Sequence, residues 1–237
     1  MQNTFERTEK KYVLTQAQCE AFYKAILPYI EPDEYAQYSI YNIYFDTEHF
    51  DLIRNSLDKP PYKEKLRMRC YETANEETKV FVELKKKYDR TVFKRRVICS
   101  LEEANNLIYE HKPLHNQTQI VQEILYFLDF YQPIPKLFLS YDRLAYHGIQ
   151  DSSLRITFDQ NIQYRTHDLS LTTNVQNHTY FQQQEVLMEI KVATAFPLWL
   201  TNILSSMAIY PASFSKYGKI YSQKLFPEHR KEFTHVS

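Results

Sequence analysis

Glycine is nearly absent from this chain of 237 residues, which contains only Gly148 and Gly218. Ordinary usage near 7% would give about 17 glycines. The chain has neither G-x-x-x-x-G-K-[ST] nor G-x-G-x-x-G, so it lacks the glycine-rich backbone loops of P-loop and dinucleotide-binding proteins. Any phosphate ligand must therefore be bound by side chains.

Cysteine and long apolar runs are also scarce. The three cysteines, Cys19, Cys70 and Cys99, lie far apart and form no C-x-x-C motif. This pattern argues against a disulfide framework or a zinc site and fits a reducing compartment. The N-terminus has no apolar signal core, and no run of 18 apolar residues occurs. We therefore expect a soluble, cytoplasmic protein with no membrane segment of its own.

Net charge is absent from the chain as a whole, with 29 basic and 29 acidic residues, but the charge is unevenly distributed. Between Tyr62 and Arg96 the sequence has 12 Lys or Arg against 6 Asp or Glu. A local basic field of this kind indicates an anionic ligand. The alternative at this point is an ordinary sheet face with its charges in water.

Alternation of polar and apolar residues dominates the sequence and predicts β-strands. The expected strands are Phe5–Val13, Tyr38–Phe45, Lys65–Tyr71, Lys79–Lys87, Val92–Cys99, Leu137–Tyr146, Ser153–Asp159 and Leu187–Val192. Helical patterns, several with capping residues, cover Thr15–Ile30, Thr47–Leu57, Ser100–Glu110, Thr118–Tyr131 and Pro197–Ala208. We predict an α+β fold, a closed antiparallel β-barrel of about eight strands with helices packed outside. Residues 1–226 would form a single domain, and residues 227–237 a flexible tail.

Most of the predicted strands carry charged residues on one face and apolar residues on the other. The charged faces, together with Lys216, hold Arg7, Glu9, Lys11, Lys65, Arg67, Arg69, Glu83, Lys85, Lys94, Arg96, Arg143, Arg155, Asp159, Glu189 and Lys191. Helices could cover the apolar faces, and the sheet could then close around the charged face as a hydrated tunnel. So many cations in one lumen would require an anion such as a triphosphate. The few carboxylates suit a divalent cation, Mg²⁺ or Mn²⁺.

Eight segments resemble, in order, the polyphosphate polymerase domain of the vacuolar transporter chaperone (VTC) complex, a branch of the CYTH-like triphosphate tunnel metalloenzymes. They are RTEKKY, KLRMR, FVELK, FKRRV, YDR, LRITFD, LMEIK and FSKY, spread over about residues 4–222. The resemblance implies an ATP-dependent polymerase that transfers the γ-phosphate of ATP to a growing polyphosphate chain in a basic tunnel. It also implies a divalent metal, commonly manganese.

The resemblance assigns roles to individual residues. The catalytic group would be Lys11, Arg67, Arg69, Arg143 and Lys216. Further substrate contacts would come from Arg7, Lys85, Lys94, Arg96, Tyr141, Arg155, Lys191 and Ser215. Glu189 matches the metal-binding glutamate, and Glu9, Glu83 and Asp159 are weaker metal candidates. Tyr44 is interpreted as a residue that packs or lines the rim.

Two departures bear on function. Hydrolytic tunnel enzymes open with E-x-E-x-K, whereas this chain has Arg7-x-Glu9-x-Lys11, which favours the polymerase branch over simple hydrolysis. The chain also lacks the membrane helices and the inositol-phosphate-sensing domain of the fungal complexes, so a separate membrane partner would have to supply transport.

Three alternatives stay open. The first is a tripolyphosphatase or nucleoside triphosphatase of the same fold. The second is a non-catalytic module that binds polyphosphate or RNA, although the charged faces lack the alternating aromatics of single-strand binders and no nucleic acid is expected. The third is a structural barrel without a ligand.

Overall fold

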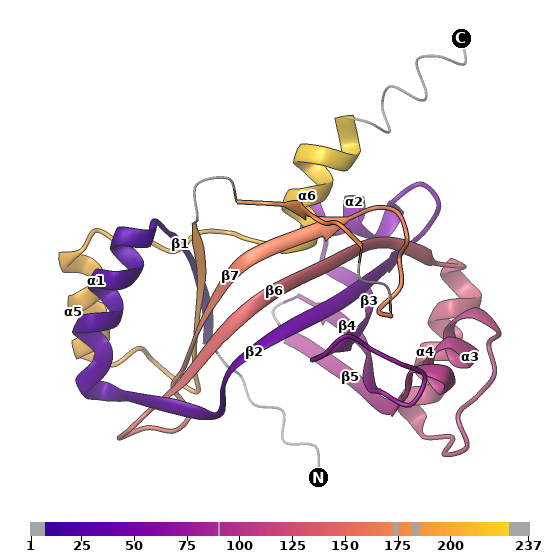
Figure 1. Cartoon of the computed structure of the whole chain (residues 1–237), viewed down its shortest axis with the longest axis horizontal. Helices are drawn as coiled ribbons and strands as arrows, with labels where there is room; N and C mark the ends of the chain where they lie inside the picture. The colour runs from indigo at the N-terminus through magenta and orange to yellow at the C-terminus, as the bar shows by residue number, and fades with distance from the viewer. Residues whose placement is uncertain (1–7, 90, 173–174, 182–184, 228–237) are drawn as a thin grey trace. The chain divides into compact units, whose positions relative to one another are not determined.

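The computed structural model describes residues 8–89, 91–172, 175–181 and 185–227. Its strands are β1 (Thr8–Leu14), β2 (Ile30–Asp46), β3 (Tyr62–Cys70), β4 (Lys79–Tyr88), β5 (Thr91–Ser100), β6 (Ile134–Gly148), β7 (Arg155–Arg165), β8 (His178–Thr179) and β9 (Val186–Val192). Its helices are α1 (Gln16–Ile26), α2 (Asp51–Leu57), α3 (Leu101–Tyr109), α4 (Gln119–Tyr131), α5 (Leu198–Ser206) and α6 (Lys216–Ile220). A 3₁₀ turn (Leu27–Tyr29) follows α1, and a π-helical turn (Tyr221–Leu225) follows α6. Figure 1 traces these elements along the chain.

The strands form one large sheet in the order β1-β9-β7-β6-β2-β3-β4-β5, with β8 paired to β7. The pairs β1–β9, β7–β9, β2–β3, β3–β4 and β4–β5 are antiparallel. The α+β prediction is therefore confirmed. The predicted barrel closure is not, because no pairing among the described residues joins the end strands β1 and β5. Closure depends on the stagger and tilt of the strands, which side-chain alternation does not specify.

The chain divides into two compact units. Unit 1 consists of Met1–Ser39, Tyr141–Ile162 and Thr179–Phe214, and unit 2 of Ile40–Ser140, Gln163–His178 and Ser215–Ser237. A single functional domain over residues 1–226 stays a prediction. The predicted tail lies outside the described residues from position 228 onward.

In unit 1 the apolar face of the sheet packs against helices α1 and α5. Ile156 and Phe158 of β7 and Met188 and Ile190 of β9 are buried in this core. Helix α1 begins after the N-cap Thr15, which forms a reciprocal capping box with Gln18. Its buried residues lie one helical turn apart, as an amphipathic helix requires. The helix thus leaves the opposite face of these strands to polar residues.

Unit 2 repeats this arrangement with its own core. The apolar residues of β3, β4 and β5, including Leu66, Val82 and Val97, pack against helices α3 and α4, which lie side by side in Figure 1. Helix α3 begins at the predicted capping box of Ser100 and Glu103. Burying this layer is the main source of stability, because the hydrophobic effect scales with the apolar area removed from water.

Most predicted elements are confirmed, many of them within a few residues at their ends, but strand β7 runs to Arg165, six residues past its predicted end, and strand β8 was not predicted. Helix α6 and the π-helical turn were not predicted. Strand β2 begins at Ile30, earlier than predicted. Its first half contains Pro32 and lacks clear alternation, so the sequence pattern did not reveal it. None of the helices in the described part of the chain is both long and apolar enough to cross a membrane.

Candidate functional site

Charged side chains of unit 2 gather on the sheet face opposite its apolar core. Strand pairing places Arg67, Glu83 and Arg96 in one row across β3, β4 and β5. The neighbouring row, two residues away on the same face, holds three lysines. We call this surface the cationic face of unit 2: Lys65, Arg67, Arg69, Glu83, Lys85, Lys94 and Arg96.

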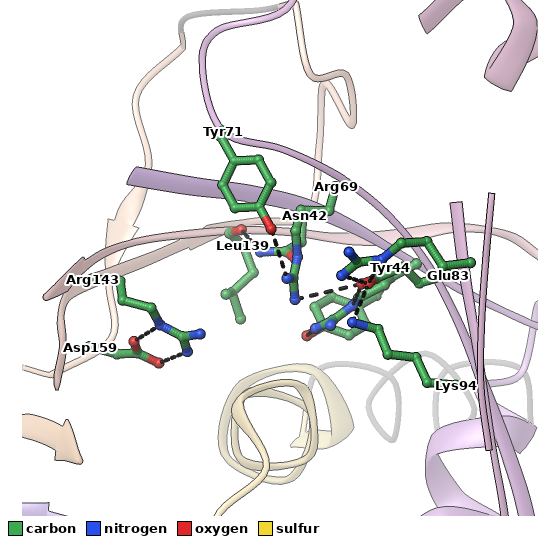
Figure 2. Close-up of polar contacts among 11 residues, drawn as sticks. Asn42, Tyr44, Arg69, Tyr71, Glu83, Lys94, Leu139, Arg143 and Asp159 are labelled. Carbon is green, nitrogen blue, oxygen red and sulfur yellow. Dashed lines mark hydrogen bonds and ion pairs between the residues drawn. The ribbon is translucent and has the colours of Figure 1, made fainter. Parts of the chain in front are cut away.

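Glu83 is the centre of this face, and four cations surround its buried carboxylate. Its two oxygens lie 2.7 Å from Arg67 Nε, 2.9 Å from Lys94 Nζ and 2.5 Å from Arg96 Nη2, and Arg69 Nη2 is 3.6 Å away. Figure 2 shows Glu83 with Lys94 and Arg69. Burial opposes ionisation of Glu83, yet the charges of Arg67, Arg69 and Lys94 hold the pKa of its carboxyl well below the ordinary value. A single carboxylate therefore forms ion pairs with four positively charged side chains.

Lys94 shows the effect of this crowding. Burial disfavours its ammonium, and repulsion from Arg96 and Arg69 adds to burial. Attraction to Glu83 only partly compensates, so the pKa of Lys94 falls to about 8. Like charges this close are stabilised by an added anion.

A buried amide orients Arg69. The side chain of Asn42 on β2 is fully buried, and its Nδ2 donates to the backbone oxygen of Leu139 at 3.1 Å. This bond turns Oδ1 toward Arg69, whose Nε donates to it at 3.2 Å. The Nη1 group reaches Tyr71 Oη at 3.5 Å, as Figure 2 shows. The guanidinium is thus held in place on the cationic face.

Tyr44 on β2 and helix α6 add to the same region. Tyr44 is the strand partner of Arg67, and its ring stacks on Tyr217 of α6 with centroids 5.2 Å apart. Lys65 lies over both rings, and its Nζ is 3.5 Å from the hydroxyl of Ser215. Ser215 caps α6 by accepting from the Gly218 N–H. These contacts place the predicted residue Ser215 beside the cationic face of unit 2.

In unit 1, Arg143 and Asp159 form a forked ion pair. Arg143 Nε and Nη2 donate to the two oxygens of Asp159 at 2.6 and 2.8 Å, as drawn in Figure 2. Asp159 is fully buried. Burial opposes the charge on Arg143, but Asp159 raises its pKa above the ordinary value. Tyr141, a predicted phosphate contact, has its ring 5.4 Å from the Arg143 guanidinium.

A second group in unit 1 joins strands β1 and β9. Lys191 Nζ lies 2.6 Å from Glu189 and 3.6 Å from Glu9, and Lys11 Nζ lies 3.4 Å from Glu9. Lys11 also donates to the backbone oxygen of Phe214 at 3.2 Å. Burial opposes ionisation of Glu189, but Lys191 and Lys11 hold the pKa of its carboxyl well below the ordinary value. We call these four residues the mixed-charge cluster of unit 1.

The remaining predicted site residues differ in their surroundings. Arg155 forms an ion pair with Asp33 at 2.6 Å, and Lys85 is exposed at the middle of its lysine row. Lys216 is partly exposed at the start of α6, close enough to influence Tyr44. Arg7 lies outside the described residues. Asn42 was not predicted as a site residue, and Tyr44 was predicted to pack or to line the rim.

The residues predicted to bind metal differ in their surroundings. Both oxygens of Glu83 and of Asp159 are paired with Arg or Lys donors. The two oxygens of Glu9 lie within 4 Å of Lys11 and Lys191, and Glu189 pairs with Lys191 through its Oε1 atom. In the part of the chain that the structure describes, no three His, Cys, Asp or Glu side chains are arranged to hold a metal. A metal here would need most of its ligands from elsewhere.

Comparison with known proteins identifies the fold and the family. No curated protein sequence is significantly similar to the chain. A candidate adenylate cyclase from Bacillus halodurans is 16% identical, with a TM-score of 0.55 over 91% of this chain and 96% of that protein. A candidate adenylyl cyclase from Hippeastrum, described as having a dominant triphosphatase activity, is 16% identical, with a TM-score of 0.54 over 91% of this chain and 95% of that one.

The two solved structures share the fold with this chain. The VTC domain family matches residues 6–224. Because this match spans most of the sequence, the chain belongs to the VTC domain family.

Proposed function

We propose that this protein binds a linear chain of phosphates on the cationic face of unit 2 and elongates it as an ATP-dependent polyphosphate polymerase. The observation that carries the proposal is the ratio of one buried carboxylate, Glu83, to the four cations that contact it. A phosphate chain supplies about one negative charge per phosphate and acceptors for forked arginine donors. Membership of the VTC domain family supports this ligand class.

In this proposal the chain's own residues act by position and charge. Phosphoryl transfer breaks the bond between the γ-phosphorus and its bridging oxygen and forms a bond to the terminal oxygen of the acceptor chain. It needs alignment and charge neutralisation more than a covalent contribution from the protein. Arg67 and Arg69 would hold phosphate oxygens, and Asn42 would keep the Arg69 fork oriented. In unit 1, Lys11 and Arg143 stay predicted phosphate contacts.

A divalent cation fits the mixed-charge cluster of unit 1 best. Mg²⁺ and Mn²⁺ take oxygen ligands, commonly one or two carboxylates together with water and phosphate. Glu189 and Glu9 offer two such carboxylates, which at present share the ammonium of Lys191. When bound, the metal would offset negative charge on phosphate oxygens. Lys191 contacts the Oε1 atom of Glu189, so its ammonium and a metal would compete for this carboxylate.

Triphosphate hydrolysis is the second candidate. The observation that favours it is the likeness of the fold to the Hippeastrum protein with triphosphatase activity. Both candidates use the same cationic face and differ in whether water or a phosphate chain accepts the phosphoryl group. Enclosure of the ligand in a tunnel, which the family resemblance implies, stays a prediction.

Incubation of the pure protein with ATP and Mn²⁺ distinguishes the two candidates. The polymerase produces polyphosphate that appears as a ladder on a polyacrylamide gel and is removed by exopolyphosphatase. Arg69→Ala should abolish this product while the protein stays folded. Release of inorganic phosphate without a polymer would replace the polymerase proposal with hydrolysis.

A further inference from the structure

The hydroxyl of Tyr44 lies among cations and is itself a potential donor. Tyr44 is 6% exposed, and its ring stacks on that of Tyr217 with an angle of 29° between the two ring planes. The hydroxyl oxygen accepts from Arg67 Nη1 at 3.4 Å. A tyrosine hydroxyl that accepts one hydrogen bond still has a proton to donate.

In the described part of the chain, the surroundings of Tyr44 offer that proton no acceptor. The charged groups that act on the hydroxyl are Arg67 and Lys65 from β3 and Lys216 from α6, and all three are cations that can only donate. Among the residues that the structure describes, no acceptor contacts the Tyr44 proton. The hydroxyl of the stacked Tyr217, by contrast, donates to Asp46 at 2.9 Å. A buried donor among cations is satisfied when an anion's oxygen enters.

We propose that Tyr44 is a phosphate-contact residue, whose hydroxyl donates to a phosphate oxygen that Arg67 and Lys65 also bind. This inference rests on the proposed function and adds a neutral donor beside the cations of unit 2. It also makes phosphate binding depend on the protonation state of a phenol. Once Tyr44 is ionised it has no proton to donate, and it repels the ligand.

The electrostatics of the site set the pH at which this change occurs. Burial alone would raise the pKa of Tyr44, but Arg67, Lys65 and Lys216 lower it to about 8. Tyr217 faces Tyr44 from α6 and has its pKa raised well above the ordinary value by burial and by Asp46, so it stays neutral. Glu83 and Lys94 lie on the same cationic face, and Lys94 also titrates at about 8. A comparison with Tyr44→Phe removes the contribution of Tyr44 and retains that of Lys94.

Calorimetric titration with inorganic tripolyphosphate tests the inference. At pH 7, Tyr44→Phe should bind about tenfold more weakly than the wild type, because one charge-assisted hydrogen bond is lost and the ring is kept. Between pH 7 and pH 9 the wild type should lose about tenfold in affinity relative to Tyr44→Phe, since a bound phosphate must return the proton to Tyr44. The two proteins should therefore bind almost equally at pH 9.

Three further variants separate the possible failures. Tyr126→Phe, a change at an exposed residue of α4, should leave both affinity and its pH dependence unchanged. Tyr217→Phe should lower the melting temperature through loss of the Asp46 bond and keep the wild-type pH dependence.

If the wild type and Arg96→Ala both fail to bind tripolyphosphate, the proposed function is wrong. If the wild type binds and Arg96→Ala is weakened, but Tyr44→Phe matches the wild type at both pH values, the role of Tyr44 is wrong.

Discussion

Glu83 holds together the four cations around it, and its removal should show how strongly they repel one another. Glu83→Gln keeps the shape of the side chain but removes the negative charge from a buried ion-pair group. We expect the free energy of unfolding at low ionic strength to fall by about 3 kcal/mol, the usual cost of leaving buried charge uncompensated. Urea unfolding measures this change, and added tripolyphosphate should restore part of the loss.

The exposed Glu77 provides the matched control for Glu83. Glu77→Gln should change stability by less than about 0.5 kcal/mol, as is usual for surface substitutions. Equal unfolding free energies for Glu83→Gln and the wild type would show that the cations do not depend on Glu83.

The stabilising effect of Glu83 should also depend on pH in a defined direction. Because the folded state holds the pKa of Glu83 well below its ordinary value of 4.5, the stabilisation is complete above that value. It is lost as the pH falls below 4.5 toward the depressed pKa. The stability difference between the wild type and Glu83→Gln should therefore be constant from pH 7 to pH 5 and shrink between pH 4 and pH 2. A difference that grows on acidification would contradict the assignment.

At this scale the sequence predicts charged residues better than neutral ones. Alternation in KLRMR, FVELK and FKRRV placed Arg67, Glu83 and Arg96 on one face, and strand pairing brings them together. Asn42 and Tyr44 carry no charge, so their roles as a support for Arg69 and a donor beside Arg67 were not recognised. Their signal is their alternation with Ile43 and Phe45 in strand β2. Ion pairing of Glu83 with four cations depends on side-chain conformations that no pattern specifies.

The unit 2 site depends on helix α6, which was not predicted from the sequence. Its five residues are too few for helical periodicity to be detected. Asp46 holds it in place, since its Oδ2 accepts from both Tyr217 and the Ile53 N–H, while its Oδ1 accepts from the Leu52 N–H. A tertiary hydrogen bond, rather than local sequence, thus fixes the helix that carries Lys216. The longer helices α3 and α4 were predicted because each has an N-capping residue and a clear apolar stripe.

Asp46→Asn tests this anchor directly. In either orientation of the amide, an NH₂ group faces backbone N–H donors at the start of α2, so at least one buried donor loses its acceptor. We expect the free energy of unfolding to fall by about 2 kcal/mol and tripolyphosphate to bind several-fold more weakly. Thermal unfolding and calorimetry measure the two effects. Wild-type values in both would show that α6 is held by other contacts.

Across the whole molecule, the sequence predicts the α+β class and most strands but not how the sheet ends. The two separate apolar cores, each with its own pair of helices, were not predicted, because alternation and helical stripes do not specify which helices cover which strands. The open path from β1 to β5 does not follow, because edge pairing is set by sheet twist and stagger. The net charge of zero gives no indication of the cationic face of unit 2, which only the local distribution of charge reveals.

The central claim is that this cationic face binds phosphate chains, and tripolyphosphate titration of arginine variants tests it most directly. The measurement compares the wild type with Arg67→Ala, Arg69→Ala and the control Lys112→Ala, which alters an exposed lysine. Each arginine variant, folded by circular dichroism, should bind at least tenfold more weakly, while the control should match the wild type. Equal affinity in all four proteins would contradict the claim.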